Sequence, residues 1–300
     1  MPLIYRPAQA SDLERADELT VQSINDLTKR HGFAPMAMPS RPQFQLFSLR
    51  DDPDGLWVAE EAGRICGFAF SWVCGDFWFL AQLFVSPDHQ GRGIGNELIT
   101  RTFEQARKAR ATNRALITFT FNTVSQGLYM RHGLYPRFPI YFFGVERERL
   151  KDRLQGAQLD HAPVGTERSE LEKLGQFDLC ALGVSREKHH SYLIGENITR
   201  GVFLYEGRDC IGYAYISSDG HIGPLAVARP EMLGTAFTTA LRLAAEGHSE
   251  QVSAFLPGTC DAALALAVQH GMRITFPMVL MSSRSVGDWT QYLPRNPGFM

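Results

Sequence analysis

VSPDHQGRGIG, residues 85–95, is the stretch that decides the fold of this chain. It follows the apolar run Ala81–Val85, which predicts a strand, and Pro87 ends that strand because proline cannot donate to a strand ladder. After the glycines, apolar residues recur at three- and four-residue spacing, which predicts a helix. A strand, a glycine-rich turn and a helix together aim backbone N–H groups from the positive end of a helix dipole. Such an arrangement binds phosphate.

The spacing of the glycines narrows the choice of phosphate ligand. A P-loop would end in Gly-Lys-Ser/Thr, which is absent, and the dinucleotide pattern G-x-G-x-x-G fails in both registers for want of its third glycine. The pattern Q-x-x-G-x-G fits, with Gln90, Gly93 and Gly95. It resembles the coenzyme A pyrophosphate loop of the GNAT superfamily of N-acetyltransferases. A flexible surface turn is the alternative interpretation.

A second segment, Asn122–Gly133, has the pattern N-x-x-x-x-G-L-Y-x-x-x-G and resembles the second GNAT signature. In that family the asparagine and its helix line the pantetheine arm, and the tyrosine lies beside the thioester sulfur. The resemblance covers about Leu3–Val145 and implies acetyl-CoA as cosubstrate. The donor-binding residues that it implies are Leu83, Phe84, Val85, Gln90, Gly91, Arg92, Gly93, Ile94, Gly95, Asn122 and Tyr129.

The chemistry of acetyl transfer gives some of these residues a role. The amides of pantetheine can add to a strand edge, here Leu83–Val85, as a further strand does. A backbone N–H from the same strand would stabilise the oxyanion. A thiol has a pKa near ~8.5 and a tyrosine near ~10, so Tyr129, at the family's position for the catalytic acid, can donate a proton or a strong hydrogen bond to the leaving thiolate. The alternative for Tyr129 is an amphipathic core residue.

The base that accepts the proton of the amine is missing from its usual place. Many GNAT enzymes have a carboxylate where this chain has Gln82, so a water chain, a neutral acceptor or a residue of the second half would have to serve. Four aromatic residues precede this position, among them Trp72 and Trp78. We expect Trp72, Trp78 and Gln82 to contact a partly apolar acceptor, although a sheet core would also account for the aromatic residues.

Composition and length limit the class of protein. Three hundred residues suggest two domains, and a formal net charge of −2 argues against a nucleic-acid partner held by bulk charge. No apolar run reaches 18 residues and no secretory signal precedes the first strand, so we expect no membrane partner. Five cysteines without metal-type spacing predict a reduced, cytoplasmic protein without a metal site.

The second half repeats the first. Gly212 takes the place of Gly67 in a hairpin and Val227 that of Val85 before a loop. We expect an α/β fold of two GNAT-like domains, each a mixed, mostly antiparallel central sheet flanked by helices. The expected parts are a catalytic domain (1–146), a linker (147–168) and a degenerate GNAT-like domain (169–300).

The second copy has lost residues that the chemistry needs. Glu231 stands where Gln90 stands and would repel pyrophosphate, and Ala267 replaces Tyr129. We therefore predict an N-acetyltransferase with one site, in the first domain, which transfers acetyl to a primary amine of a small molecule or peptide by direct attack. The second domain would complete the acceptor pocket or form a homodimer contact. The alternative is a non-catalytic acyl-CoA-binding module whose second domain binds a partner.

Overall fold

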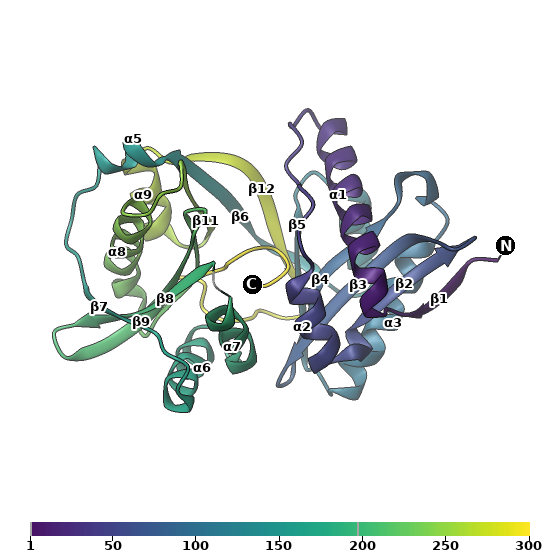
Figure 1. Ribbon diagram of the computed structural model, residues 1–300, viewed down its shortest axis with the longest axis horizontal. Helices are drawn as coiled ribbons and strands as arrows, with labels where there is room; N and C mark the ends of the chain where they lie inside the picture. The colour runs from purple at the N-terminus through teal and green to yellow at the C-terminus, as the bar shows by residue number, and fades with distance from the viewer. Residues whose placement is uncertain (1, 197) are drawn as a thin grey trace. The chain divides into compact units, whose positions relative to one another are not determined.

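The chain divides into two compact units in the computed structural model, which describes residues 2–196 and 198–300 (Figure 1). The first unit comprises the chain up to Ile117, Phe121–Tyr135 and Ser282–Arg284; the second comprises Thr118–Thr120, Pro136–Met281 and Ser285–Met300. The expected boundary at residue 146 differs from this division. The reason is that β6 (Tyr135–Glu146) pairs with β11 (Gln251–Pro257) and so joins the second unit.

The first unit is a sheet of five strands in the order β1-β2-β3-β4-β5. Neighbouring strands are antiparallel except β4 and β5, which are parallel. The helix α1 lies in front of this sheet and α3 behind it in Figure 1. The elements are β1 (Ile4–Pro7), α1 (Leu13–Arg30), α2 (Gln43–Asp51), β2 (Leu56–Glu61), β3 (Arg64–Cys74), β4 (Phe77–Val85), α3 (Ile94–Lys108), β5 (Asn113–Phe119) and α4 (Thr123–Arg131).

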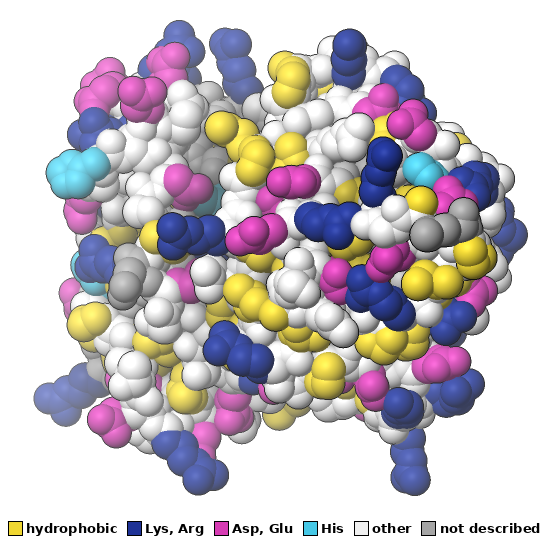
Figure 2. Space-filling view, turned by 45° about the vertical axis from the view of Figure 1, so that its right-hand side comes forward, with side chains coloured by type: hydrophobic (Ala, Val, Ile, Leu, Met, Phe, Trp, Pro, Cys, Tyr) yellow, Lys and Arg dark blue, Asp and Glu magenta, His cyan; other side chains and the backbone are white. Residues whose placement is uncertain are grey.

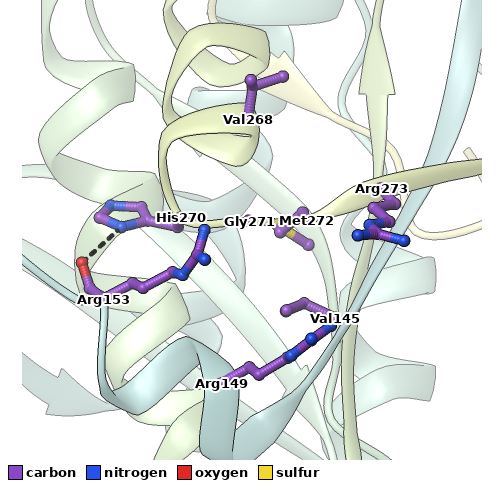
Figure 3. A pocket seen from close by; sticks show the side chains of 8 residues that line it. All are labelled: Val145, Arg149, Arg153, Val268, His270, Gly271, Met272 and Arg273. Atoms are coloured by element: carbon purple, nitrogen blue, oxygen red, sulfur yellow. Dashed lines mark hydrogen bonds between the residues drawn. The ribbon is translucent and has the colours of Figure 1, made fainter.

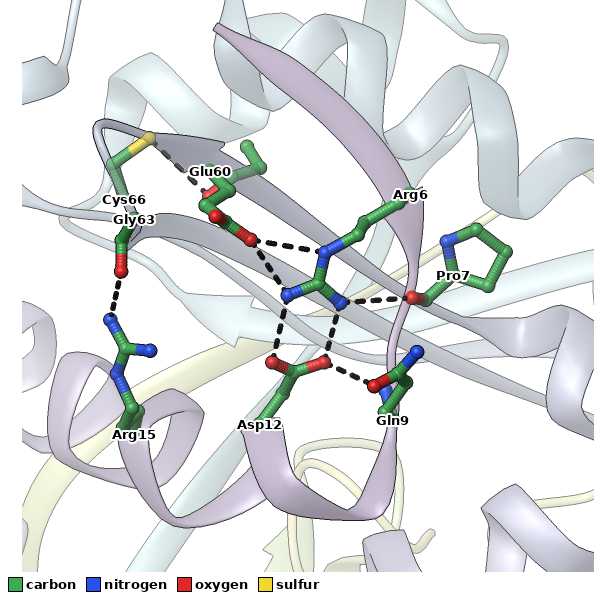
Figure 4. A network of polar contacts seen from close by, with 9 residues as sticks. Arg6, Pro7, Gln9, Asp12, Arg15, Glu60, Gly63 and Cys66 are labelled. Carbon is green, nitrogen blue, oxygen red and sulfur yellow. Dashed lines mark hydrogen bonds and ion pairs between the residues drawn. The ribbon is translucent and has the colours of Figure 1, made fainter. Parts of the chain in front are cut away.

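The guanidinium of Arg6 ties the edge of this sheet to the start of α1 (Figure 4). It donates to both carboxylate oxygens of Asp12, at 2.6 and 2.9 Å, and to Glu60 of β2 at 2.7 and 3.0 Å. These hydrogen bonds from Arg6 hold the pKa of Asp12 below its usual range. Because charge-assisted, bidentate bonds are the strong ones, one side chain fixes β1, β2 and the turn that leads into α1.

A glycine lets α3 lie close on the sheet. A Cβ at Gly67 in β3 would come within 2.9 Å of side-chain atoms of both Ile94 and Leu98. Ile94 and Leu98 are fully buried against Ala59 and Ala69 of the sheet. This close packing fixes the first turn of α3, and with it the glycine-rich turn that precedes the helix.

The second unit repeats this pattern around a core of its own. Its strands follow the order β12-β6-β11-β10-β9-β8-β7, with β13 paired to β10. Its elements include β7 (Asp160–Pro163), α6 (Arg168–Leu182), α7 (Glu187–Gly195), β8 (Thr199–Glu206), β9 (Asp209–Ser217), β10 (His221–Val227), α8 (Leu233–Ala245), α9 (Asp261–Gln269), β12 (Arg273–Ser282) and β13 (Tyr292–Leu293). Both units thus have the predicted mixed, mostly antiparallel sheet with helices. The expected linker 147–168 also contains structure, namely α5 (Arg147–Lys151) and β7.

A buried polar network joins four elements of the second unit. The carboxylate of Asp178 in α6 accepts hydrogen bonds from Arg186 (2.9 Å), from His190 of α7 (3.0 Å) and from the hydroxyl of Tyr213 in β9. Arg186 also donates to the hydroxyl of Tyr292 in β13 at 2.6 Å. Each charge in this buried cluster has partners, which is the condition for tolerating charge in a core.

No helix among the described residues is both long enough and apolar enough to cross a membrane.

Candidate donor-binding site

One edge of β4 is open beyond its midpoint. β4 pairs with β3 along its whole length, with a register shift at Ala81, but it pairs with β5 only over Phe77–Leu80. Beyond Leu80, no described strand pairs with β4 on its β5 side. The predicted donor residues Leu83, Phe84 and Val85 lie in this half-buried stretch. Backbone groups of successive strand residues point to opposite sides, so the N–H and C=O groups of this stretch that face away from β3 can pair with an extended ligand that carries amides. The exception is the Val85 carbonyl, which accepts hydrogen bonds from Ser23 and Gln90.

The glycine-rich turn follows directly and has the conformation that its sequence predicts. Gly91 and Gly93 have φ values of +79° and +81°, which favour glycine for the backbone alone. Gly93 is the N-cap residue of α3, and the first backbone bond into the helix runs from the N–H of Glu97 to the carbonyl of Gly93 at 3.1 Å. The amides of Ile94, Gly95 and Asn96 precede that bond and have no acceptor within the helix. Free amides at the positive end of a helix dipole can bind an anion.

The side chains of the turn are engaged with the protein. The amide of Gln90 donates to the carbonyl of Val85 at 3.2 Å. The guanidinium of Arg92 makes a bidentate ion pair with Glu61 of β2, at 2.7 and 3.1 Å. This pairing lowers the pKa of Glu61 to about 2. The side chains of Arg92 and Gln90 therefore stabilise the turn. Its backbone amides are the groups that could bind a pyrophosphate.

The helix α4 contributes the other two predicted residues. Asn122 is its N-cap residue, and its side-chain oxygen accepts the N–H of Ser125 at 3.2 Å. Tyr129, about two turns beyond Asn122, is 5% exposed. Burial raises the pKa of its hydroxyl well above the ordinary value, against an opposing hydrogen bond from Ser125. A raised pKa favours the protonated hydroxyl, which can donate a hydrogen bond.

The position of the missing base is filled by an amide pair. The side-chain oxygen of Gln82 accepts a hydrogen bond from Gln45 of α2 at 3.2 Å. An amide cannot take up a proton from an amine at neutral pH. The segment before α2 is held in place by Asn25 of α1, whose oxygen accepts the N–H groups of Met36 and Ala37, both at 3.0 Å.

The two tryptophans expected at the acceptor side are core residues. Trp72 and Trp78 are 1% and 0% exposed, so neither offers a surface to a substrate. Trp72 stacks on Phe79 at 4.9 Å between ring centroids, and Trp78 contacts Phe103 of α3 at 4.8 Å. Because successive side chains of a strand point to opposite faces, the aromatic cluster of the sequence is shared between the two faces of the sheet.

Comparison with known proteins agrees with this geometry. Residues 21–134 match the model of the acetyltransferase (GNAT) family. The chain carries a GNAT acetyltransferase domain. The glycine-rich turn, the open part of β4 and the whole of α4 lie within the matched residues, which confirms the predicted resemblance.

Some similar proteins match only part of this chain, and others match nearly its whole length. The chain is 34% identical over 70 residues to an uncharacterised N-acetyltransferase of Methanocaldococcus jannaschii, a match that spans 20% of this chain and 30% of that protein. Its fold is similar to that of a Pyrococcus horikoshii protein assigned as an acetyltransferase, with a TM-score of 0.78 and 16% identity over 99% of this chain and 96% of that one. It is also similar to a tandem GNAT protein from the clavulanic acid biosynthesis pathway (TM-score 0.62, 17% identity, 95% and 98% coverage).

In the second unit, β10 is the counterpart of β4, but β13 pairs with the edge that is open in β4. β10 pairs with β11 only at His221 and Ile222, as β4 does with β5 only in its first part. Beyond this point, Leu225 and Ala226 pair with Leu293 and Tyr292 of β13. The segment that sequence comparison matches to Leu83–Val85 thus already has a partner strand.

The described residues contain no group of three His, Cys, Asp or Glu side chains that could hold a metal ion.

Proposed function

We propose that the first unit is an acetyl-CoA-dependent N-acetyltransferase, which transfers an acetyl group to a primary amine of a small molecule or peptide in the cytoplasm. The observation that carries the proposal is the open edge of β4 that runs directly into the glycine-rich turn before α3. The edge suits the two amides of pantetheine, and the amides at the start of α3 suit the pyrophosphate. Acetyl-CoA supplies the thioester whose carbonyl carbon is attacked.

The residues of the chain would act on charge and protons. As the C–N bond forms and the C–S bond breaks, negative charge passes from the carbonyl oxygen to the sulfur. A backbone N–H of β4 would stabilise the oxygen. Tyr129 would donate a hydrogen bond to the sulfur, and its raised pKa favours hydrogen bonding over complete proton transfer to a thiolate whose own pKa is near ~8.5.

The proton of the attacking amine needs a different account. Because Gln82 is an amide held by Gln45, the site offers no carboxylate at that position. We propose that the amine reacts in its neutral form and loses its proton to water after attack. The rate with any acceptor should then rise with pH up to the pKa of that amine.

We also propose that the second unit is a degenerate copy without a donor site. Three observations support this proposal. β13 pairs with β10 where a donor would add, Ala267 stands in place of Tyr129, and Glu231 stands in place of Gln90. An added negative charge at the loop disfavours a pyrophosphate, and a paired strand has no free edge to offer.

Calorimetric titration of acetyl-CoA into the purified chain, followed by an assay of released thiol against a panel of amines, tests both proposals. We expect one site per chain and turnover of at least one amine. Binding without turnover of any amine would instead favour the acyl-CoA-binding module, which the amide at position 82 also fits. Two sites per chain would contradict the degenerate copy, and no binding would remove the acetyltransferase.

A further inference from the structure

A pocket in the second unit gathers three arginines. It has a volume of about 220 Å³ and lies where the end of α9 meets the start of β12 (Figure 3). Arg149 of α5, Arg153 of the following turn and Arg273, the first residue of β12, contribute to its lining. Val145, Val268 and Met272 supply apolar surface, and no carboxylate lines the pocket.

These three positive charges are almost without partners. Within the described chain, no carboxylate lies within 4.0 Å of Arg153 or Arg273, and Arg149 has only a 3.8 Å contact with Glu146 between exposed side chains. On the face in Figure 2, by contrast, basic and acidic side chains are intermixed. Like charges that lie close together without a counter-charge repel each other. An anion bound in this pocket would relieve that repulsion.

The scaffold under the arginines is fixed. Leu150 of α5 is fully buried in the core and so holds the short helix in place. The carbonyl of Arg153 accepts a hydrogen bond from Nδ1 of the fully buried His270 at 3.0 Å, which requires the proton of His270 to be on Nδ1. A Cβ at Gly271 would lie 2.8 Å from the guanidinium of Arg153, so glycine allows this side chain to rest on the chain at the end of α9.

The negative end of the α9 dipole compensates part of the positive charge of the three arginines. A helix C-terminus carries roughly half a negative charge, and Arg153, packed on Gly271 at that end, offsets it. The charges of Arg149 and Arg273, on other elements, then remain for a ligand. Two guanidinium groups match the charge of a doubly ionised phosphate, and their planar forks match its oxygens in pairs.

We propose that this pocket binds the phosphate group of a small phosphorylated molecule. The volume is below the range of roughly 300–1,000 Å³ that drug-sized ligands occupy, but it exceeds the space that a phosphate alone needs. The apolar surface of Val145, Val268 and Met272 would contact a short organic part joined to the phosphate. The proposal does not depend on acetyl transfer, because all of these residues belong to the second unit.

Calorimetric titrations at constant ionic strength test the site, with inorganic phosphate, glycerol phosphate and citrate as probes. We expect saturable binding of both phosphates, tighter for glycerol phosphate, and no saturable binding of citrate. The double variant Arg149→Gln/Arg273→Gln removes the two charges left for the ligand and should weaken phosphate binding at least about tenfold. The matched control Arg208→Gln removes an exposed arginine in the turn between β8 and β9 and should change the affinity less than about twofold.

Two further variants separate loss of phosphate binding from loss of the fold and from binding at the first unit. Arg273→Gln alone removes an exposed side chain with no described hydrogen bond, so it should weaken binding without disturbing the fold. Gly93→Val alters the phosphate-binding turn of the first unit and should leave phosphate binding in the second unit unchanged. The proposal is overturned by absence of saturable binding, by preference for citrate, by equal losses in Arg208→Gln and Arg273→Gln, or by loss of phosphate binding in Gly93→Val.

Discussion

The backbone N–H of Val227 donates a hydrogen bond to the carbonyl oxygen of Gln291 at 3.0 Å, and so extends the pairing of β10 with β13. Val227 is the counterpart of Val85, and no described strand pairs with β4 at Val85 on the β5 side. The same strand edge is therefore closed in the second unit and open in the first. Open strand edges bind extended ligands, and closed ones do not.

This contrast predicts that the donor site depends on the turn of the first unit alone. Gly93→Val forces a β-branched residue into a φ of +81° and displaces the amides at the start of α3. We expect the affinity for acetyl-CoA to fall at least about tenfold, as measured by calorimetry.

The matched control is Gly207→Val in the β8–β9 turn of the second unit, where φ is +61° and a Cβ would likewise meet no atom within 4 Å. It introduces the same kind of backbone strain, about 1–2 kcal/mol, away from the turn. Equal losses of affinity in the two variants would show that strain and not the loop geometry is responsible.

Tyr129→Phe should lower kcat by about 10² while the KM for acetyl-CoA changes little. The hydroxyl stabilises charge that appears on sulfur only as the C–S bond breaks, so its loss affects the transition state and not donor binding. Steady-state kinetics with an accepted amine measures both constants. Tyr135→Phe, at a 52% exposed tyrosine just after α4, is the control and should behave as the unaltered chain. An unchanged kcat in Tyr129→Phe would make Tyr129 a core residue.

Gln82→Glu should move the pH dependence of the rate. In the unaltered chain we expect kcat/KM to rise with pH until the acceptor amine is neutral. A carboxylate at position 82 would accept the proton, so the rising limb should shift by about one pH unit or more toward acid. Gln45→Glu adds the same charge on the other side of the pair and is the control. An identical pH profile in the unaltered chain and in Gln82→Glu would show that a carboxylate at position 82 does not accept the proton of the amine.

Asp178→Asn should destabilise the second unit by about 3–5 kcal/mol, because it leaves Arg186 buried without its counter-charge. Denaturant unfolding followed by near-ultraviolet circular dichroism measures the loss. Asp209→Asn, at an exposed aspartate that begins β9, should change stability by less than about 0.5 kcal/mol.

The same carboxyl makes stability depend on pH. Burial raises the pKa of Asp178, but the charges and hydrogen bonds of Arg186 and His190 outweigh it and hold the pKa well below its usual value. A depressed folded-state pKa means that the unfolded chain binds more protons in acid, so stability rises with pH. The contribution should be complete above about pH 5 and fall as the pH drops through 4 toward the folded-state pKa. Asp178→Asn should flatten this slope; an equal slope in both proteins would contradict it.

Local spacing was enough to predict the glycine-rich turn and the repeated order of elements. The turn depends on a few consecutive residues, and glycine is the residue that adopts the positive φ found at Gly91 and Gly93. The capping role of the Asn122 side chain was not predicted. The same spacing could not tell which face of the sheet each tryptophan would occupy, because that depends on helices that pack from both sides.

Pairing between distant segments was decided by the tertiary structure alone. β13 closes the edge of β10, β6 joins the second unit through β11, and three arginines from separate elements line one pocket. None of these follows from a local pattern, since any strand with free N–H and C=O groups can pair with any other of suitable register. The sequence by itself determined that this chain has two copies of one fold and a glycine-rich turn before a helix in the first. The tertiary structure decided which copy keeps an open edge, because an edge stays open only where no other part of the chain reaches it.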